Sequence, residues 1–199
     1  AERDTNAESV QKAAETAVIE GNLSRLEELL RQHPELVKEM AEPYVPQGPG
    51  PKYENGVARF IIERGHQFQN FDEFVAHREL IKDPNHPAAQ FEQTIEPVIN
   101  GDLATLQRLL RANPELVHMR SPRTHHSTLL HYVGANGVEG WRQKSPKNSV
   151  EVAETLLKAG AKIDAEAGMY GGGCTTPDLV ATSIHPWLAG VVEPLMDFL

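Results

Sequence analysis

The chain has 199 residues, of which 24% are charged and 40% hydrophobic, and its formal net charge is −9 at pH 7. This charge disfavours binding to nucleic acid or to an anionic membrane, because both require a basic surface. The single cysteine, Cys174, excludes an intrachain disulfide and a metal site built from several cysteines. No window approaches the roughly 18 apolar residues of a membrane span. We expect a cytoplasmic protein by default; removal of a signal peptide from a precursor is also compatible with the sequence.

Residues 1–40 predict a pair of helices. The first runs over 8–20 and ends at Gly21, since glycine followed by asparagine interrupts the helical pattern. The second runs over 23–32 and ends before Pro34, because proline has no backbone N–H to continue the helical hydrogen bonds.

Residues 41–87 predict a Pro/Gly-rich loop followed by divergent helices. Four prolines and three glycines lie within 41–56, a composition typical of a loop or linker. Helical periodicity resumes at Val57 and again at Phe71. The turn at 83–87 then leads into a further helix pair, over 88–100 and 103–112.

One segment of the chain occurs twice. Residues 18–37 read VIEGNLSRLEELLRQHPELV and residues 98–117 read VINGDLATLQRLLRANPELV, so 12 of the 20 paired positions are identical. The shared leucines follow a spacing that places them on one face of a helix, whereas the polar positions between them vary. A unit that keeps its apolar face is built to stack on a neighbour, which indicates a helical repeat protein. Proteins of this class usually act by binding.

The sequence STLLHYVGANG, which begins at Ser127, resembles the opening of an ankyrin repeat. The family pattern is a Gly-x-Thr-Pro-Leu-His turn, an alanine-rich inner helix, and a glycine between the helices. The matching residues are Thr128, Leu130, His131, Gly134, Ala135 and Gly137, and Leu129 stands where the family usually has proline. Residues 150–165 resemble the outer helix and the entry to the next finger, the hairpin that precedes each inner helix. A further unit begins at Gly173, with 180–181 in its inner helix and 191–199 as its outer helix.

The chain is thus similar to a divergent, bacterial ankyrin-repeat protein, most specifically over 98–199. The resemblance implies an all-α fold: an ankyrin-like helical repeat stack (α-solenoid) with a divergent N-terminal helical region and long loop insertions. Residues 88–199 would form the ankyrin-like repeats of a single elongated repeat domain. The resemblance also implies a non-catalytic recognition module that binds another protein through its concave face and insertion loops. We expect no catalytic residue and no cofactor, and the sequence leaves the partner and the oligomeric state open.

An insertion between Gly137 and the outer helix carries Trp141 and Arg142. In the family fold this loop lies at the same edge as the equivalent loop of the next unit, which holds His185 and Trp187. Tryptophan and arginine are enriched at binding hot spots, so we expect these four residues to contact a partner. The alternative is that the two tryptophans only cover each other. Because periodicity continues on both sides of the insertion, we expect the fold not to need it.

The finger at 165–175 is longer than usual and contains Tyr170 followed by three glycines. The resemblance places Tyr170 beside the preceding finger, which holds His125 and His126, and predicts a second surface cluster of these three residues. The alternative function is an enzyme or small-molecule binder, with a pocket built by this cluster or by the Trp141 and His185 loops. The glycines favour a hairpin with positive φ over an anion-binding loop.

Other groups capable of chemistry receive structural interpretations. The histidines between 118 and 131 lack the spacing of a zinc site, so we expect no metal, and the family pattern gives His131 hydrogen bonds within and between units. Cys174 with His131 or His185 would make a nucleophile pair, but a lone cysteine here is more often a small packing residue. Glu139 and Glu151 are close only in sequence.

Overall fold

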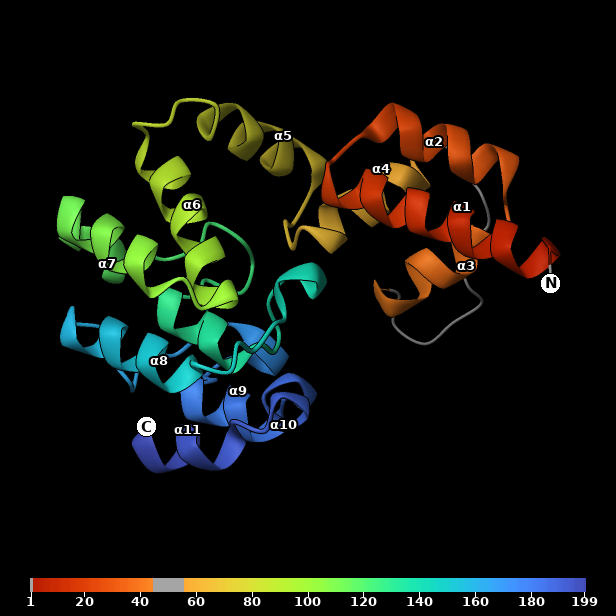
Figure 1. Cartoon of the computed structure of the whole chain (residues 1–199). Helices are drawn as coiled ribbons and strands as arrows, with labels where there is room; N and C mark the ends of the chain where they lie inside the picture. Colours follow the sequence, from red (N-terminus) through yellow and green to blue (C-terminus); the bar gives the residue numbers. More distant parts are fainter. Residues whose placement is uncertain (1, 45–55) are drawn as a thin grey trace. The chain divides into compact units, whose positions relative to one another are not determined.

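The computed structural model describes residues 2–44 and 56–199, and the chain divides into two compact units, Ala1–Val75 and Ala76–Leu199. Regular structure in the described residues is helical, apart from a single antiparallel bridge between Ala167 and Cys174 (Figure 1). The predicted all-α class is therefore confirmed. Most of the predicted loop at 41–56 lies outside the described residues.

The first unit packs its helices around one apolar core. Its elements are α1 (Glu2–Ile19), α2 (Leu23–Gln32), α3 (Leu36–Ala41), the 3₁₀ turn η1 (Glu42–Tyr44), α4 (Val57–Gly65) and the start of α5 (Phe71–Leu80). Helix α4 contacts α1, α2 and α3, and so lies at the centre of the unit. The expected helix pair over 1–40 thus omitted α3. A short helix after Pro34 escapes a periodicity test, because six residues contain fewer than two turns.

The repeated segment adopts the same local structure in both copies. A glycine with positive φ, Gly21 or Gly101, precedes a side chain that caps the next helix. Asn22 accepts a hydrogen bond from the backbone of α2, and Asp102 does the same for α7 (Leu103–Ala112), which satisfies one free N–H of each first turn. Leucines that the two copies share are buried in the core of their own unit. They are Leu26, Leu29 and Leu30 in the first unit and Leu106 and Leu110 in the second.

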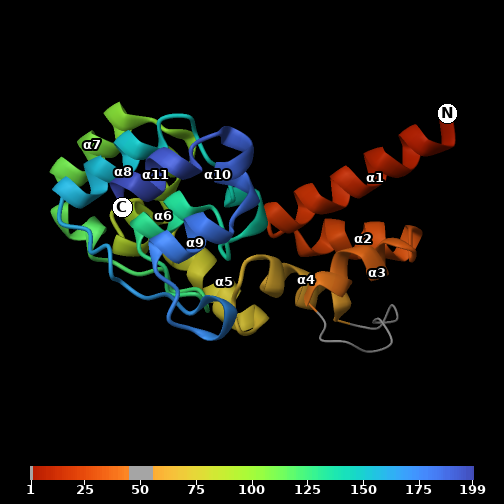
Figure 2. The same cartoon turned by 90° about the horizontal axis from the view of Figure 1, so that it is seen from below.

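The second unit arranges its elements in two rows. These elements are the end of α5, α6 (Pro87–Asn100), α7, the 3₁₀ turns η2 (Pro114–Val117), η3 (Leu129–Gly134), η4 (Gly140–Arg142) and η5 (Met169–Gly171), and α8 (Ser149–Lys158), α9 (Thr176–Thr182), α10 (Ile184–Ala189) and α11 (Val192–Phe198). One row contains α6, η3 and α9 in contact, and the other contains α7, α8 and α11 (Figures 1 and 2). Helix α6 also contacts α7, η3 contacts α8, and α9 contacts α11, so each row supports the other.

The expected inner helix near Ser127 is only the 3₁₀ segment η3. It ends at Ala135, whose left-handed φ of 47° stops the helix. At Gly134 the two inner elements approach closely: an added Cβ would lie 2.6 Å from Cβ of Leu179 on α9. His131 makes the hydrogen bonds expected of it, with Thr128 at its own turn and with the carbonyl of Ala165 at 2.9 Å.

The finger at 165–175 is a tight hairpin. The backbone N–H of Ala167 donates to the carbonyl of Cys174 at 2.8 Å, and the reverse bond is 3.2 Å. Gly171, Gly172 and Gly173 all have positive φ, between 77° and 103°. The expectation of a hairpin that requires glycine is therefore confirmed, since positive φ strains most other residues.

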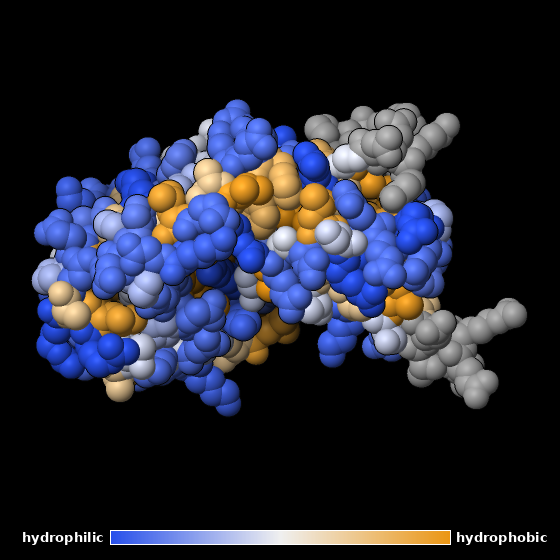
Figure 3. Space-filling model, turned by 90° about the horizontal axis from the view of Figure 1, so that it is seen from above, coloured by the Kyte–Doolittle hydropathy of each residue, from blue (hydrophilic) through white to orange (hydrophobic). Residues whose placement is uncertain are grey.

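Hydrophilic residues predominate on the face of the molecule drawn in Figure 3, with apolar patches between them. Within the described residues, no helix combines the length and apolarity that crossing a membrane requires.

Candidate interaction site

Helix α10 exposes three large apolar side chains on one side. Ile184 is 60% exposed, and Trp187 and Leu188 are each 68% exposed. Their spacing of three and four residues places them next to one another on a helix. We call this group the α10 surface. An exposed apolar cluster of this kind is typical of a protein contact, because tryptophan in particular gains from leaving water.

Helix α10 is held in place from its opposite side. Ser183 caps it, accepting a hydrogen bond from the N–H of His185, and its hydroxyl donates to the carbonyl of Ala135 at 2.9 Å. Pro186 is buried, and Gly190 ends the helix with a φ of 71°. The expectation of a loop at His185 and Trp187 was wrong, because proline is tolerated in the first turn of a helix, where its missing N–H has no helical partner. His185 itself is half-buried.

We expected Arg142 to lie on an exposed edge with the two tryptophans, and this expectation was wrong. Trp141 is partly buried and Arg142 is 9% exposed, both in the 3₁₀ turn η4. The guanidinium of Arg142 contacts Oε2 of Glu92 at 2.8 Å and Oε1 of Glu139 at 2.7 Å. A buried guanidinium requires such partners, because an unpaired buried charge is expensive. Arg142 is therefore a packing residue of the second unit.

A second guanidinium completes this buried network. Arg123 contacts both oxygens of Glu92 and also Oε1 of Glu139, the latter through Nε at 2.6 Å. Each of these two carboxylates thus faces two guanidinium groups, and each guanidinium bridges both carboxylates. Nε of Arg142 also lies 3.6 Å from Oε1 of the exposed Glu96. The four formal charges cancel, which makes the burial of this group tolerable.

Three further side chains close the network. Nε2 of His77 on α5 lies 3.2 Å from Glu92, and Nε2 of His125 lies 3.5 Å from Glu139. The hydroxyl of the fully buried Tyr132 donates to Glu139 at 3.2 Å. These contacts join α5, α6, η3, the finger before η3 and the insertion into one polar cluster.

Burial and charge act in opposite directions on these carboxylates. Burial by itself would raise the pKa of Glu139, but Arg123, His125 and Arg142 lower it to about 2. For Glu92, burial again opposes the shift, while His77 and the two guanidinium groups hold the pKa far below its usual range. Burial is also the main reason that the pKa of Tyr132 is raised. Both carboxylates are therefore charged and the phenol neutral at neutral pH.

This network joins the insertion to the rest of the second unit. Glu139 and Arg142 come from the insertion and pair with Glu92 on α6 and with Arg123 in the preceding finger. The expectation that the fold does not need the insertion is therefore contradicted. Glu139 and Glu151, which are close only in sequence, also have different environments, since Glu151 is exposed and Glu139 is completely buried.

His125, His126 and Tyr170, which were expected to form a second surface cluster, do not share one surface, because His125 is buried and the other two are exposed. His125 is 2% exposed; its Nδ1 accepts from the N–H of Ser127, and its other nitrogen faces Glu139. His126 is exposed, with a positive φ of 50°. The two fingers do lie side by side, because the N–H of Gly168 donates to the carbonyl of His125 at 2.7 Å. Tyr170 is 73% exposed and bonds to Asn136 instead of to a histidine.

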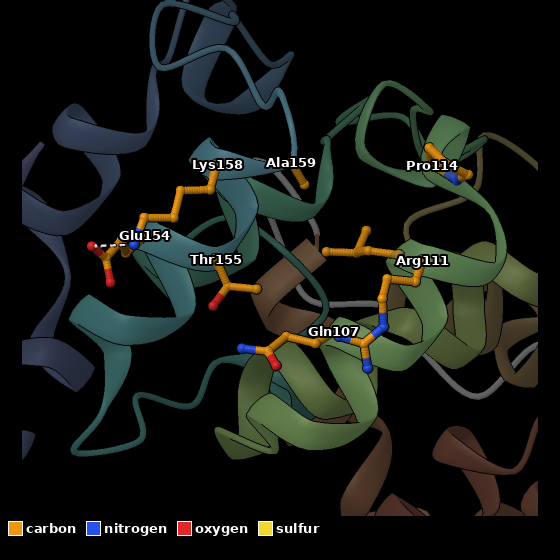
Figure 4. Close-up of a pocket in the computed structure, with 8 residues that line it drawn as sticks. Gln107, Arg111, Pro114, Glu154, Thr155, Lys158 and Ala159 are labelled. Carbon is orange, nitrogen blue, oxygen red and sulfur yellow. Dashed lines mark ion pairs between the residues drawn. The ribbon is translucent and has the colours of Figure 1, made fainter.

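Hollows among the described residues of the second unit include two that are large enough for a small group. The first, of about 570 Å³, lies between α7 and α8 (Figure 4). Gln107 and Arg111 face Thr155 across it, and Lys158 is paired with Glu154 at 2.7 Å. The second, of about 490 Å³, lies beside Tyr170 and is lined by Asn136, Tyr170, Cys174, Asp178, Leu179 and Thr182.

Of the residues proposed to build a pocket for an enzyme or small-molecule binder, Tyr170 lines the second hollow, whereas His125, His126, Trp141 and His185 line neither of these two. Cys174 donates its thiol hydrogen to the carbonyl of Met169 at 3.2 Å. Burial lowers the pKa of His131 to about 4, despite the opposing hydrogen bond to Ala165, so this ring is neutral at pH 7. In the described part of the chain, no three His, Cys, Asp or Glu residues are grouped so that they could hold a metal ion.

Sequence reasoning missed most of the buried network, and one signal pointed to it. Glu92 lies three residues before Ile95, on the face of α6 that otherwise carries only apolar or small side chains into the core. A glutamate on an apolar stripe predicts a buried partner of opposite charge. Comparisons with protein-family models, with curated proteins and with solved structures found no match for this chain.

Proposed function

We propose that this chain is a non-catalytic recognition module that binds another protein, and that its second unit is an ankyrin-type stack. The two rows of helical elements support the stack, since each inner element contacts the next one and its own outer helix. The turns before the inner elements support it too. Thr128 pairs with His131 in one proposed repeat, and Thr175 pairs with Asp178 at the same place in the next repeat.

The α10 surface is the observation that carries the proposal. Three large apolar side chains within a six-residue helix remain mostly exposed, although this helix is capped at both ends and anchored through Ser183. Burying one such side chain is worth about 1.5–3 kcal/mol, so a partner with an apolar groove gains substantially by covering all three. Trp187 is the expected hot spot of the contact.

The buried network argues for rigidity instead of catalysis. Its two carboxylates pair with both guanidinium groups, and the side chains of Glu139 and Arg123 are at most 4% exposed. A substrate has no access to such groups, whereas a rigid support lowers the entropic cost of binding a partner.

The test is site-specific photo-crosslinking. A photoreactive amino acid at position 187 is expected to trap a protein partner in the producing cell. The same amino acid at position 80 serves as the matched control, because Leu80 on α5 is also an exposed apolar residue, at 46%. Trapping only another copy of this chain, or equal trapping at both positions, would contradict the proposal.

A further inference from the structure

The hollow beside Tyr170 has a wall fixed by a chain of hydrogen bonds. The hydroxyl of Tyr170 donates to Oδ1 of Asn136 at 2.6 Å, and the amide of Asn136 donates to Oγ1 of Thr182 at 3.0 Å. Thr182 in turn donates to the backbone carbonyl of Asp178 at 2.7 Å. The finger, the turn after η3 and helix α9 are thus linked around one hollow of about 490 Å³.

Tyr170 is held in a position that its own backbone does not prefer. Its φ is 51°, a left-handed conformation that is unfavourable for a bulky residue. The hydroxyl is bonded while 73% of the residue remains exposed, so the aromatic ring is presented to solvent at a fixed place. Strain of this kind persists only where surrounding contacts impose it, and it is concentrated at ligand contacts.

The charge of the hollow is negative. Asp178 is exposed on its rim, and neither Lys nor Arg is among the six residues that line it. The N–H and the hydroxyl of Thr175 both donate to Oδ2 of Asp178, at 2.9 and 2.7 Å. These bonds lower the pKa of Asp178, which keeps the carboxylate ionised at neutral pH. Among the described residues Oδ1 accepts no hydrogen bond, so it is available to a donor from outside.

We propose that this hollow receives the cationic end of a lysine or arginine side chain of the protein partner. Oδ1 of Asp178 would accept its hydrogen bond, and the exposed ring of Tyr170 would stack on the cation. This inference rests on the proposed recognition function and specifies the chemistry of the partner. A basic partner also suits a chain with a net charge of −9. Helix α10 begins two residues after Thr182, so the basic side chain would lie next to the apolar contact.

The test is a titration of the whole chain with N-acetyl-arginine amide and N-acetyl-lysine amide, followed by ¹H–¹⁵N NMR. The expected result is saturable shifts of the amides of Asn136, Tyr170 and the three glycines that follow Tyr170. N-acetyl-citrulline amide, which has nearly the shape of the arginine probe without its charge, is the matched ligand control. It is expected to bind at least tenfold more weakly.

Two variants identify the groups involved. Asp178→Asn keeps an acceptor for Thr175 and is expected to weaken binding of the arginine probe at least tenfold, whereas Asp197→Asn makes the same charge change on α11 and leaves binding unchanged. Tyr170→Leu is expected to weaken it severalfold. Equal shifts with the citrulline probe, or full binding by Asp178→Asn, would overturn the inference. Because the probes are single amino acids, failure here leaves crosslinking at position 187 as a separate test of the proposed function.

Discussion

Replacing Arg142 by methionine is expected to destabilise the second unit strongly. Methionine preserves much of the volume of the side chain but removes the contacts to Glu92 and Glu139. Two carboxylates would then face the single guanidinium of Arg123, which leaves an uncompensated charge in a buried cluster.

The structure sets the size of the effect. The side chain of Arg142 is only 11% exposed, so water does little to screen the remaining charge. Removing one partner of a buried ion pair costs about 3–5 kcal/mol. At a urea m-value of about 2 kcal/mol/M, the midpoint of unfolding should fall by roughly 2 M. The midpoint of Arg142→Lys should lie between those of the wild type and Arg142→Met, since an ammonium keeps the charge but cannot form two parallel hydrogen bonds as a guanidinium does.

The assay is urea unfolding followed by tryptophan fluorescence. Trp141 and Trp187 are the only tryptophans of the chain, and both belong to the second unit, so the signal reports on that unit alone. Lys144→Met is the control, because Lys144 is an exposed residue of the same insertion. If Arg142→Met and Lys144→Met have the same midpoint, the network does not fasten the insertion.

Three further predictions concern the core, the close approach of the inner elements, and pH. Leu26→Ala and Leu106→Ala, at equivalent positions of the repeat, should each cost about 2–5 kcal/mol in urea unfolding followed by circular dichroism, which reports on both units. Glu27→Ala should cost almost nothing, and similar losses for all three would show that the buried face is misassigned. Gly134→Ala should lower the melting temperature by several degrees, because the new Cβ meets Leu179. Gly140→Ala should leave it unchanged, since nothing lies within 4 Å of an added Cβ there, and equal effects would refute the close approach of η3 to α9. Stability should fall on acidification. The pKa of His131 is lowered to about 4 in the folded protein, so its contribution to stability is complete above about pH 6.5 and is lost as the pH falls to 4. The contribution of Glu139 is lost as the pH falls from its ordinary pKa near 4.5 to about 2. Melting temperatures that stay constant from pH 7 to 3 would contradict these assignments.

The elements with strong local signals were predictable from the sequence. Helices α2 and α7 begin and end where glycine, a capping side chain and a proline mark them, so their bounds agree with the prediction. Helix α10 was missed because Pro186 has opposite meanings inside a helix and in its first turn. The segment η3 was expected to be an α-helix, but its close approach to α9 and the left-handed Ala135 depend on tertiary packing.

The candidate surfaces were predictable only in part. Trp187 and Tyr170 are exposed, as expected of contact residues, whereas Arg142 and His125 are buried in the network. Arginine is found both at hot spots and in buried ion pairs, and composition does not distinguish the two roles. The partner of Arg142 on α6 lies fifty positions earlier in the chain, so no local pattern joins them.

The most direct test of the recognition function is the affinity of Trp187→Ala for the protein trapped by crosslinking at position 187. Calorimetric titration of the purified pair should show binding at least tenfold weaker than that of the wild-type chain, because an exposed tryptophan at the centre of a contact typically contributes 2 kcal/mol or more, roughly a thirtyfold effect. Its melting temperature should stay within a few degrees of the wild type, since Trp187 is 68% exposed. Leu80→Ala should bind as the wild type does. Unchanged affinity of Trp187→Ala would contradict the account.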